Sequence, residues 1–204
     1  GTIFADNLTS RNSAKLATRS TLDIGANGTH TAGATTAAGS VGQQTIAGNI
    51  VYQNGATVAW DLVANSVTNP GTDYDQFVVN NGGSISFDSA LNLEIVFGSG
   101  VDFENSFWNT AGTNEWEIWN GTVSDVSAIT FSLSEDSAAE NEQYFTASAF
   151  EISNDNFGGT DTGQGVWLRQ LAAIPEPSTF SLLGLGLAGF GWFARRRRNR
   201  QSVS

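Results

Sequence analysis

Apolar and polar residues alternate along several short stretches of this chain. In residues 57–62 the alternation places Val58, Trp60 and Leu62 on one face of an extended strand. Residues 129–133 repeat the pattern, with three apolar side chains on one face. A spacing of two residues is that of a half-buried strand, whereas a helix needs apolar positions three or four residues apart. The pattern therefore predicts β-strands.

Turn signals separate these stretches from further short apolar runs. Gly and Asn accept the positive φ that tight turns need, and the chain holds 23 Gly while only 14% of its residues are charged. We expect turns at 54–55, 69–71 and 81–83, and further strands at 21–24, 45–52, 77–79, 85–87, 91–95, 145–152 and 165–171. The chain is therefore expected to be all-β.

One segment of the chain occurs twice in similar form. Residues 48–52 followed by 56–63 resemble residues 83–87 followed by 90–96. Each copy has the pattern of a strand, a turn and a second strand that ends in apolar residues. Such repeats occur in solenoids, where each coil covers the core of its neighbour. The strands of a β-sandwich look the same locally, so the pattern leaves both architectures open.

The composition divides the chain into segments. Residues 1–40 are rich in Thr, Ala, Gly and Asn, and we interpret them as a low-complexity, incomplete lead-in. Residues 41–171 carry the strand pattern and form the predicted β domain, and residues 172–177 form a linker. Because the chain has no Met, we expect that Gly1 is not the start of translation.

Charged residues are unevenly distributed. The formal net charge is −11, and no Lys or Arg occurs between Arg19 and Arg169. Binding to nucleic acid depends on neutralising phosphates, so this acidic body excludes a nucleic-acid partner. The lack of Cys excludes disulfides and thiolate metal sites.

The last thirty residues differ from the body. Pro175 and Pro177 flank Glu176 and favour extended backbone. Residues 178–194 carry no charge and are just long enough for a transmembrane helix. The tail 195–204 follows, and the positive-inside rule places it in the cytoplasm with the body outside. The basic residues that form the expected membrane stop signal are Arg195, Arg196, Arg197, Arg198 and Arg200.

This order of Pro-Glu-Pro, a Gly- and Leu-rich span and an Arg cluster resembles the PEP-CTERM sorting signal. The resemblance implies recognition by an exosortase, a membrane cysteine protease-transpeptidase of Gram-negative bacteria that also secrete extracellular polysaccharide. It implies that Pro175, Glu176 and Pro177 form the recognition motif, with processing nearby. The precursor would be anchored in the inner membrane with its body outside the cytoplasm, and then displayed on the cell surface or in the extracellular matrix.

A second resemblance covers about residues 45–120. The segments GATVAWDL, GTDYDQFVV and GSGVDFENSFWNT are similar to the region that follows autotransporter-associated β-strand repeats in large bacterial surface proteins. That family implies a right-handed parallel β-solenoid with a structural or adhesive role. We therefore expect such a solenoid, with a β-sandwich as the alternative, plus one C-terminal transmembrane helix.

Few residues suit catalysis, and we expect that the chain is not an enzyme. His30 is the only histidine, no G-x-S-x-G motif accompanies it, and we interpret it as a surface residue. Glycoside hydrolysis needs only two carboxylates, so a secreted hydrolase is the least favoured alternative. An acidic β surface produces such pairs freely. The candidate pairs are Asp73 with Asp75, Asp102 with Glu104, and Glu115 with Glu117.

Two groups are candidates for binding. Asp155 and Asp161 lie among glycines and amides that suit calcium, although their spacing fits neither an EF-hand nor a Gly/Asp nonapeptide repeat. No other metal or cofactor is expected. Trp116 and Trp119 could form a glycan platform, although core packing is the commoner fate of Trp. The sequence favours a structural or adhesive surface protein, with a carbohydrate-binding surface module as the alternative.

Overall fold

The computed structural model shows the body of the chain as β-structure. It describes residues 2–9, 15–16, 21–32, 41–80, 82–123, 125–134, 149–155, 157, 163–171 and 173. These residues form fourteen strands and one short 3-10 helix, so the all-β prediction is confirmed. Contacts divide the chain into two units, residues 1–173 and 174–204, and the second unit lies outside the described residues.

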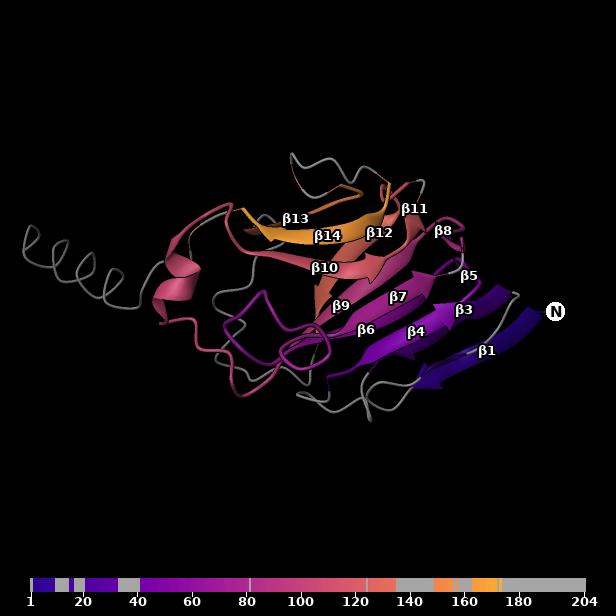
Figure 1. The fold of residues 1–204 in the computed structure, drawn as a ribbon, viewed down its shortest axis with the longest axis horizontal. Coiled ribbons are helices and arrows are strands. Elements are labelled where there is room, and N and C mark those ends of the chain that lie inside the picture. The colour runs from indigo at the N-terminus through magenta and orange to yellow at the C-terminus, as the bar shows by residue number, and fades with distance from the viewer. Residues whose placement is uncertain are drawn as a thin grey trace, which may run out of the picture. The chain divides into compact units, whose positions relative to one another are not determined.

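The strands belong to two sheets (Figure 1). The first sheet contains β1 (Thr2–Thr9), β3 (Thr21–Thr31), β5 (Asn49–Tyr52), β6 (Ala56–Leu62), β8 (Ser84–Phe87), β9 (Leu91–Phe97), β11 (Thr122–Val123) and β12 (Ile129–Leu133). The second contains β2 (Lys15–Leu16), β4 (Gln43–Ala47), β7 (Gln76–Asn80), β10 (Glu115–Asn120), β13 (Phe150–Ser153) and β14 (Gly165–Gln170). Helix η1 spans Ser106–Asn109. The strand orders are β11-β8-β5-β3-β6-β9-β12, with β1 against β3, and β13-β14-β10-β7-β4-β2.

Strands far apart in the sequence lie side by side and parallel. β5 pairs with β8 and β6 pairs with β9, and both pairings join residues 35 positions apart, such as Ile50 and Ile85. Residues 48–52 and 83–87 are therefore similar in sequence because they occupy equivalent positions on two paired strands. β3 is long enough to pair with β5 through its first half and with β6 through its second half. The chain thus runs through the two sheets repeatedly, and we call each such repeat a passage. Each further passage adds strands to both sheets.

One edge of the second sheet is antiparallel. β2, β4, β7 and β10 run parallel, but β14 pairs antiparallel with β10 and β13 pairs antiparallel with β14. β14 is therefore hydrogen-bonded along both edges. Its register places Trp167 opposite Glu117 and Arg169 opposite Glu115, so these side chains form rows on the outer face.

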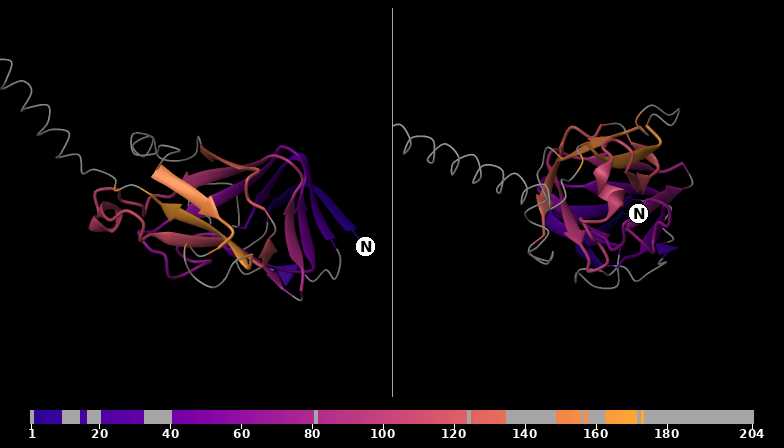
Figure 2. Two further views of the ribbon diagram at one scale, coloured as in Figure 1. Left: turned by 90° about the horizontal axis from the view of Figure 1, so that it is seen from above. Right: turned by 90° about the vertical axis from the view of Figure 1, so that its left-hand side faces the viewer.

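The core lies between the two sheets, which face each other in Figures 1 and 2. Tyr52 and Phe87 of the first sheet pack against Trp119 of the second, with ring centroids 6.0 and 5.7 Å from the indole. Phe77 stacks on the same indole at 5.9 Å. Each such aromatic pair contributes about 0.5–1.5 kcal/mol beyond the burial of its area. The aromatic residues therefore join the two layers.

Strand β6 is buried on both faces. Ala59 and Asp61 would face solvent by alternation, yet they are 5% and 1% exposed. The loop 63–75 covers them: the Asp75 N–H donates to the Asp61 carbonyl, and the Asp61 N–H donates to Asp75 Oδ2. Burial, followed by the nearby charge of Asp61, raises the pKa of Asp75 well above its usual range. The loop thus closes this part of the outer face.

The N-terminal segment is not a loose lead-in where the structure describes it. β3 lies inside the first sheet, with Leu22 and Ile24 fully buried, and β1 pairs with it in parallel. The strand expected at 21–24 is confirmed as the first part of β3. Parallel pairing satisfies the backbone hydrogen-bonding groups of this Thr- and Gly-rich strand.

Within the part of the chain that the structure describes, no helix is long and apolar enough to span a membrane. The predicted transmembrane helix at residues 178–194 lies outside that part.

Candidate functional site

A groove opens on the body where β7 and β10 end and β14 begins. Its volume of about 470 Å³ falls within the range of about 300–1,000 Å³ that is usual for small-molecule sites. Glu117, Asn120, Thr122 and Gln164 supply polar lining, and Trp167 supplies an indole. Glycines and one valine complete the lining. The groove is therefore polar, with one large aromatic side chain.

Amide side chains fix the carboxylate of Glu117. Gln43 Nε2 donates to Gln76 Oε1 at 2.7 Å, and Gln76 Nε2 donates to Glu117 Oε2 at 2.8 Å. Asn120 Nδ2 donates to Glu117 Oε1 at 2.8 Å. The ladder follows β4, β7 and β10 across the outer face of the sheet. Both carboxylate oxygens are therefore oriented by the protein itself.

Gly83 and Gly121 keep one side of the groove at the level of the backbone. A Cβ on Gly83 would lie 1.8 Å from the carbonyl oxygen of Gly48, and a Cβ on Gly121 would lie 2.9 Å from the Cβ of Val79. Gly121 also has φ +152°, which L side chains rarely adopt. Glycine is needed here because each passage of the chain runs directly over the previous one.

Trp167 flanks the groove opposite the glycines. A Cβ on Gly165 would lie 3.1 Å from the indole Nε1 and 2.9 Å from Glu117 Oε1, so both groups flank that glycine. The Trp167 side chain is half-buried. Its Nε1 is buried without a hydrogen-bond partner in the described residues, whereas the indole N–H groups of the four core tryptophans all donate to oxygens.

The sequence analysis did not single out Trp167 or Gln164. Alternation could have found the first, because Val166 and Leu168 point inward in β14 and Trp167 must then point outward. It could not have shown that Trp167 lies beside Glu117, since that contact depends on the antiparallel pairing of β14 with β10.

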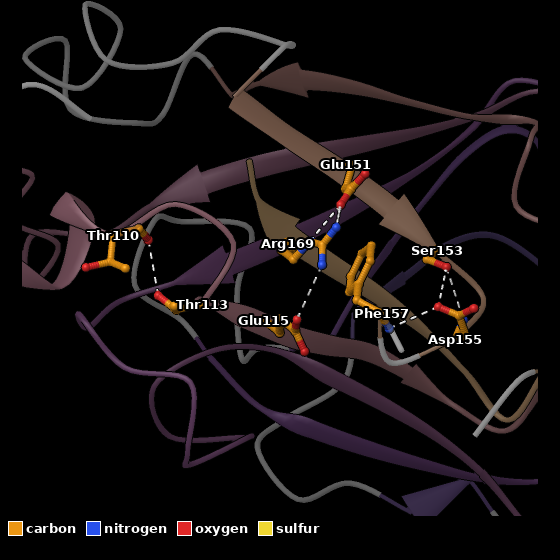
Figure 3. A network of polar contacts seen from close by, with 8 residues as sticks. All are labelled: Thr110, Thr113, Glu115, Glu151, Ser153, Asp155, Phe157 and Arg169. Atoms are coloured by element: carbon orange, nitrogen blue, oxygen red, sulfur yellow. Dashed lines mark hydrogen bonds and ion pairs between the residues drawn. The ribbon is translucent and has the colours of Figure 1, made fainter. Parts of the chain in front are cut away.

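A second polar cluster joins β10, β14 and β13 (Figure 3). Arg169 donates from Nε and Nη2 to Glu151 Oε1, and its Nη1 lies 3.9 Å from Glu115 Oε1. Its guanidinium carbon lies 4.0 Å from the ring centroid of Phe157, a cation–π geometry. Burial raises the pKa of Glu115, and the charge of Arg169 opposes this effect. The cluster therefore ties three strands together.

One of the two calcium candidates, Asp155, lies next to this cluster. Asp155 Oδ1 accepts hydrogen bonds from Ser153 Oγ at 2.8 Å and from the Phe157 N–H at 3.0 Å (Figure 3), which closes a tight turn. Asp161 lies outside the described residues. Among the residues that are described, no three His, Asp or Glu side chains are placed to hold a metal. Calcium binding here stays a prediction.

Trp116 and Trp119 do not form a glycan platform. Both are fully buried, and their N–H groups donate to the Ser66 carbonyl and to Tyr52 Oη. The register of β10 against β14 shifts between Glu117 and Trp119. Such a bulge turns side chains three positions apart to the same face, here the inner one. The platform hypothesis was therefore wrong for these two residues.

His30 is a core residue and not a surface residue. It is fully buried, its Nδ1 accepts from the Tyr52 hydroxyl at 2.8 Å, and its Nε2 donates to Gln44 Oε1. Burial lowers the pKa of His30 to about 4, so the ring is neutral at pH 7. The surface interpretation was wrong because the sequence neighbours are small and polar, whereas the partners lie 14 and 22 residues away.

The carboxylates considered for hydrolysis make contacts with the protein's own groups. Asp75 is buried and accepts from two backbone N–H groups. Asp73 accepts from a side-chain amide, and Asp102 accepts from the backbone N–H two residues further on. Glu115 faces a guanidinium and Glu117 is held by amides. The absence of catalytic activity stays a prediction.

The C-terminal end of the chain matches a known sorting motif. Residues 173–198 match the PEP-CTERM protein-sorting motif. This chain carries a PEP-CTERM signal. The prediction of that signal from Pro175, Glu176 and Pro177 is confirmed at the level of the motif, and the three residues themselves lie outside the described part of the structure.

A PEP-CTERM signal marks an exported, membrane-anchored precursor that an exosortase processes for surface display. The exosortase is therefore a partner of this chain. Comparison with curated proteins and with solved structures gives no match. The resemblance of residues 45–120 to autotransporter-associated proteins stays a prediction.

Proposed function

We propose that this PEP-CTERM protein is a structural or adhesive component of the bacterial surface. The observation that carries the proposal is the position of the signal: the match begins at residue 173, and β14 ends at Gln170. The folded body is thus joined directly to its sorting tail. In this proposal the exosortase recognises Pro175, Glu176 and Pro177 and performs the chemistry, and the chain is its substrate.

Before processing, residues 178–194 cross the inner membrane and the body lies outside the cytoplasm. The uncharged span and the basic residues behind it support this topology. Arginine side chains can extend a short span by reaching the headgroup region. The residues that hold the cytoplasmic end are Arg195, Arg196, Arg197, Arg198 and Arg200.

We also infer that the body is a right-handed parallel β-solenoid. Three columns of parallel strands support this: β5, β8 and β11; β6, β9 and β12; and β4, β7 and β10. A Greek-key sandwich pairs its strands mainly antiparallel. Among the strand-to-strand pairings of the described residues only those of β14 are antiparallel, apart from one isolated bridge between Leu62 and Tyr74. Parallel crossovers are right-handed in about 98% of cases. A stacked body offers long, regular faces for structural or adhesive contacts.

Mass spectrometry of the protein recovered from its native host tests the sorting proposal. We expect a C-terminus trimmed near residue 177 in the wild type and an intact C-terminus in Pro175→Ala and Pro177→Ala. Pro70→Ala is the matched control, because Pro70 lies in the loop 63–75 of the body, at a bridge to Tyr74, and its replacement leaves the signal unchanged. An untrimmed wild type that retains its arginines would show that the tail is only an anchor.

A carbohydrate-binding surface module is the second candidate, with extracellular polysaccharide as the partner. The groove beside Trp167 favours it, because the groove combines an indole with carboxylate, amide and hydroxyl groups.

A further inference from the structure

We propose that the groove between β10 and β14 binds a neutral saccharide, with the ring of one sugar against Trp167 and its hydroxyls against Glu117 and Asn120. The proposal concerns the body alone. It is therefore independent of how the tail is sorted.

The indole of Trp167 supplies the apolar part of the site. A sugar ring has a face of C–H groups and a rim of hydroxyls, so a binding site needs an aromatic face next to polar groups. Among the tryptophans that the structure describes, Trp167 alone retains exposure, and the other four are fully buried. It lies opposite Glu117 in the register, which places the two kinds of group side by side.

The polar part of the site is oriented before any ligand binds. Gln76 and Asn120 hold the two oxygens of Glu117, so the carboxylate loses little freedom when it accepts a hydroxyl proton. The Asn120 amide spends one N–H on this contact. Its carbonyl and second N–H make no hydrogen bond within the described residues, and a hydroxyl can pair with either. Thr122 and Gln164 add exposed groups at the rim.

The indole N–H of Trp167 gives a second reason for a ligand here. A buried donor without a partner costs about 1–3 kcal/mol. The indole Nε1 lies beside Gly165 and makes no hydrogen bond within the described residues. A ligand that lets the ring turn its N–H toward a hydroxyl oxygen recovers part of that cost.

The charge of the groove selects against anions. Among the described residues, its lining contains Glu117 and no basic residue. Residues 1–174 hold 19 acidic residues against four basic ones. A phosphate, sulfate or uronate would therefore approach a fixed negative charge without a compensating cation. A neutral saccharide meets no such barrier.

Calorimetric titration of the full chain, held in a detergent without a sugar headgroup, tests the proposal. The probes are neutral oligosaccharides of glucan, mannan and galactan type, together with an oligogalacturonate. We expect at least one neutral probe to bind more tightly than the anionic one. Trp167→Ala should weaken that binding by about tenfold or more. Phe131→Ala is the control, because it removes a half-buried aromatic side chain from β12 in the other sheet.

A second pair of variants tests the site by filling it. Gly82 lines the groove, and Gly112 lies in a distant turn; both have φ +73°, and a Cβ on either meets nothing within 4 Å. Asn tolerates this backbone conformation. Gly82→Asn should weaken binding by about tenfold, whereas Gly112→Asn should change it less than twofold. This pair decides the question if Trp167→Ala unfolds.

The proposal is overturned if no neutral probe binds, if the anionic probe binds best, or if Gly82→Asn binds as the wild type does. Mass spectrometry of the same variants should show normal trimming of the tail. A failure to bind saccharide would therefore not contradict the sorting proposal. An untrimmed C-terminus would not contradict the saccharide proposal.

Discussion

Burial of His30 should make the body of this protein sensitive to acid. The neutral ring accepts a hydrogen bond from the Tyr52 hydroxyl at Nδ1 and donates a hydrogen bond to Gln44 Oε1 from Nε2. Trp119 donates to the same hydroxyl oxygen. Protonation of Nδ1 would place a donor against the Tyr52 hydroxyl and a positive charge in the core. The folded state therefore resists protonation of this ring.

The size of the effect follows from the two proton affinities. The pKa of His30 falls from 6.5 to about 4 in the folded state. Between these values the unfolded chain binds more protons, so stability is lost as pH decreases from 6.5 to 4. A tenfold difference in proton affinity corresponds to about 1.36 kcal/mol, so this ring alone removes up to about 3.4 kcal/mol. Typical domains are stable by only about 5–15 kcal/mol.

Urea unfolding of residues 1–173, followed by tryptophan fluorescence between about pH 7 and about pH 4, measures this loss. The comparison is with His30→Gln, which cannot titrate. The loss of the variant is subtracted from that of the wild type because Asp75 affects stability in the opposite direction. Burial raises the pKa of its carboxyl, so the folded state binds more protons than the unfolded chain and gains stability as pH decreases. We expect the wild type to lose about 3 kcal/mol more than His30→Gln.

Parallel pH profiles for the two proteins would refute this reasoning. If their losses differ by less than about 0.5 kcal/mol, the ring is either exposed or already charged in the folded state. Asp75→Asn gives an independent check on the sign, because it should steepen the acid loss of the wild type.

Three further predictions concern packing in the body. Gly83→Ala should destabilise it by about 3 kcal/mol, measured by the urea midpoint, because the new Cβ would overlap a backbone carbonyl of the previous passage of the chain; an unchanged midpoint would contradict the close stacking. Arg169→Ala should cost only about 1 kcal/mol, since its ion pairs are partly exposed, and the loss should shrink at high salt. Arg169→Lys should recover part of the charge effect without the planar stacking on an aromatic ring. Trp116→Ala should lower the free energy of unfolding by about 3–5 kcal/mol because it leaves a cavity in the core. The affinity of the folded fraction for saccharide should be unchanged.

Local alternation in the sequence predicted strands well where outward-facing and inward-facing residues differ strongly in polarity. The stretch 129–133 became β12 with the same bounds. The repeated segment gave the register between β5 and β8 correctly, because Ile50 and Ile85 occupy equivalent places in successive passages of the chain. Both predictions needed only residues that are near each other or repeated.

The failures have a common physical cause, which is dependence on distant partners. The strand expected at 21–24 extends to Thr31 in β3, and this Thr- and Gly-rich extension belongs to the sheet because it pairs with β1 and β6. A bulge in β10 turned Trp116 and Trp119 inward, and no local pattern announces a bulge. The groove needs β14 to return antiparallel beside β10, which places Trp167 next to Glu117. Neither residue's neighbours in the sequence indicate that contact.

The pairing of β14 on both edges has a mechanical consequence for a protein held by its C-terminus. β14 ends at Gln170, shortly before the sorting signal begins at residue 173, and a force on that end of the strand has a component along the axis of β14. The ladder bonds to β10 and β13 lie perpendicular to that axis, and a pull along it loads them together in shear. A terminal edge strand pulled sideways would instead unzip one bond at a time. Pairing on both edges thus makes β14 resist a pull along its own axis more strongly than a strand that is paired on one edge.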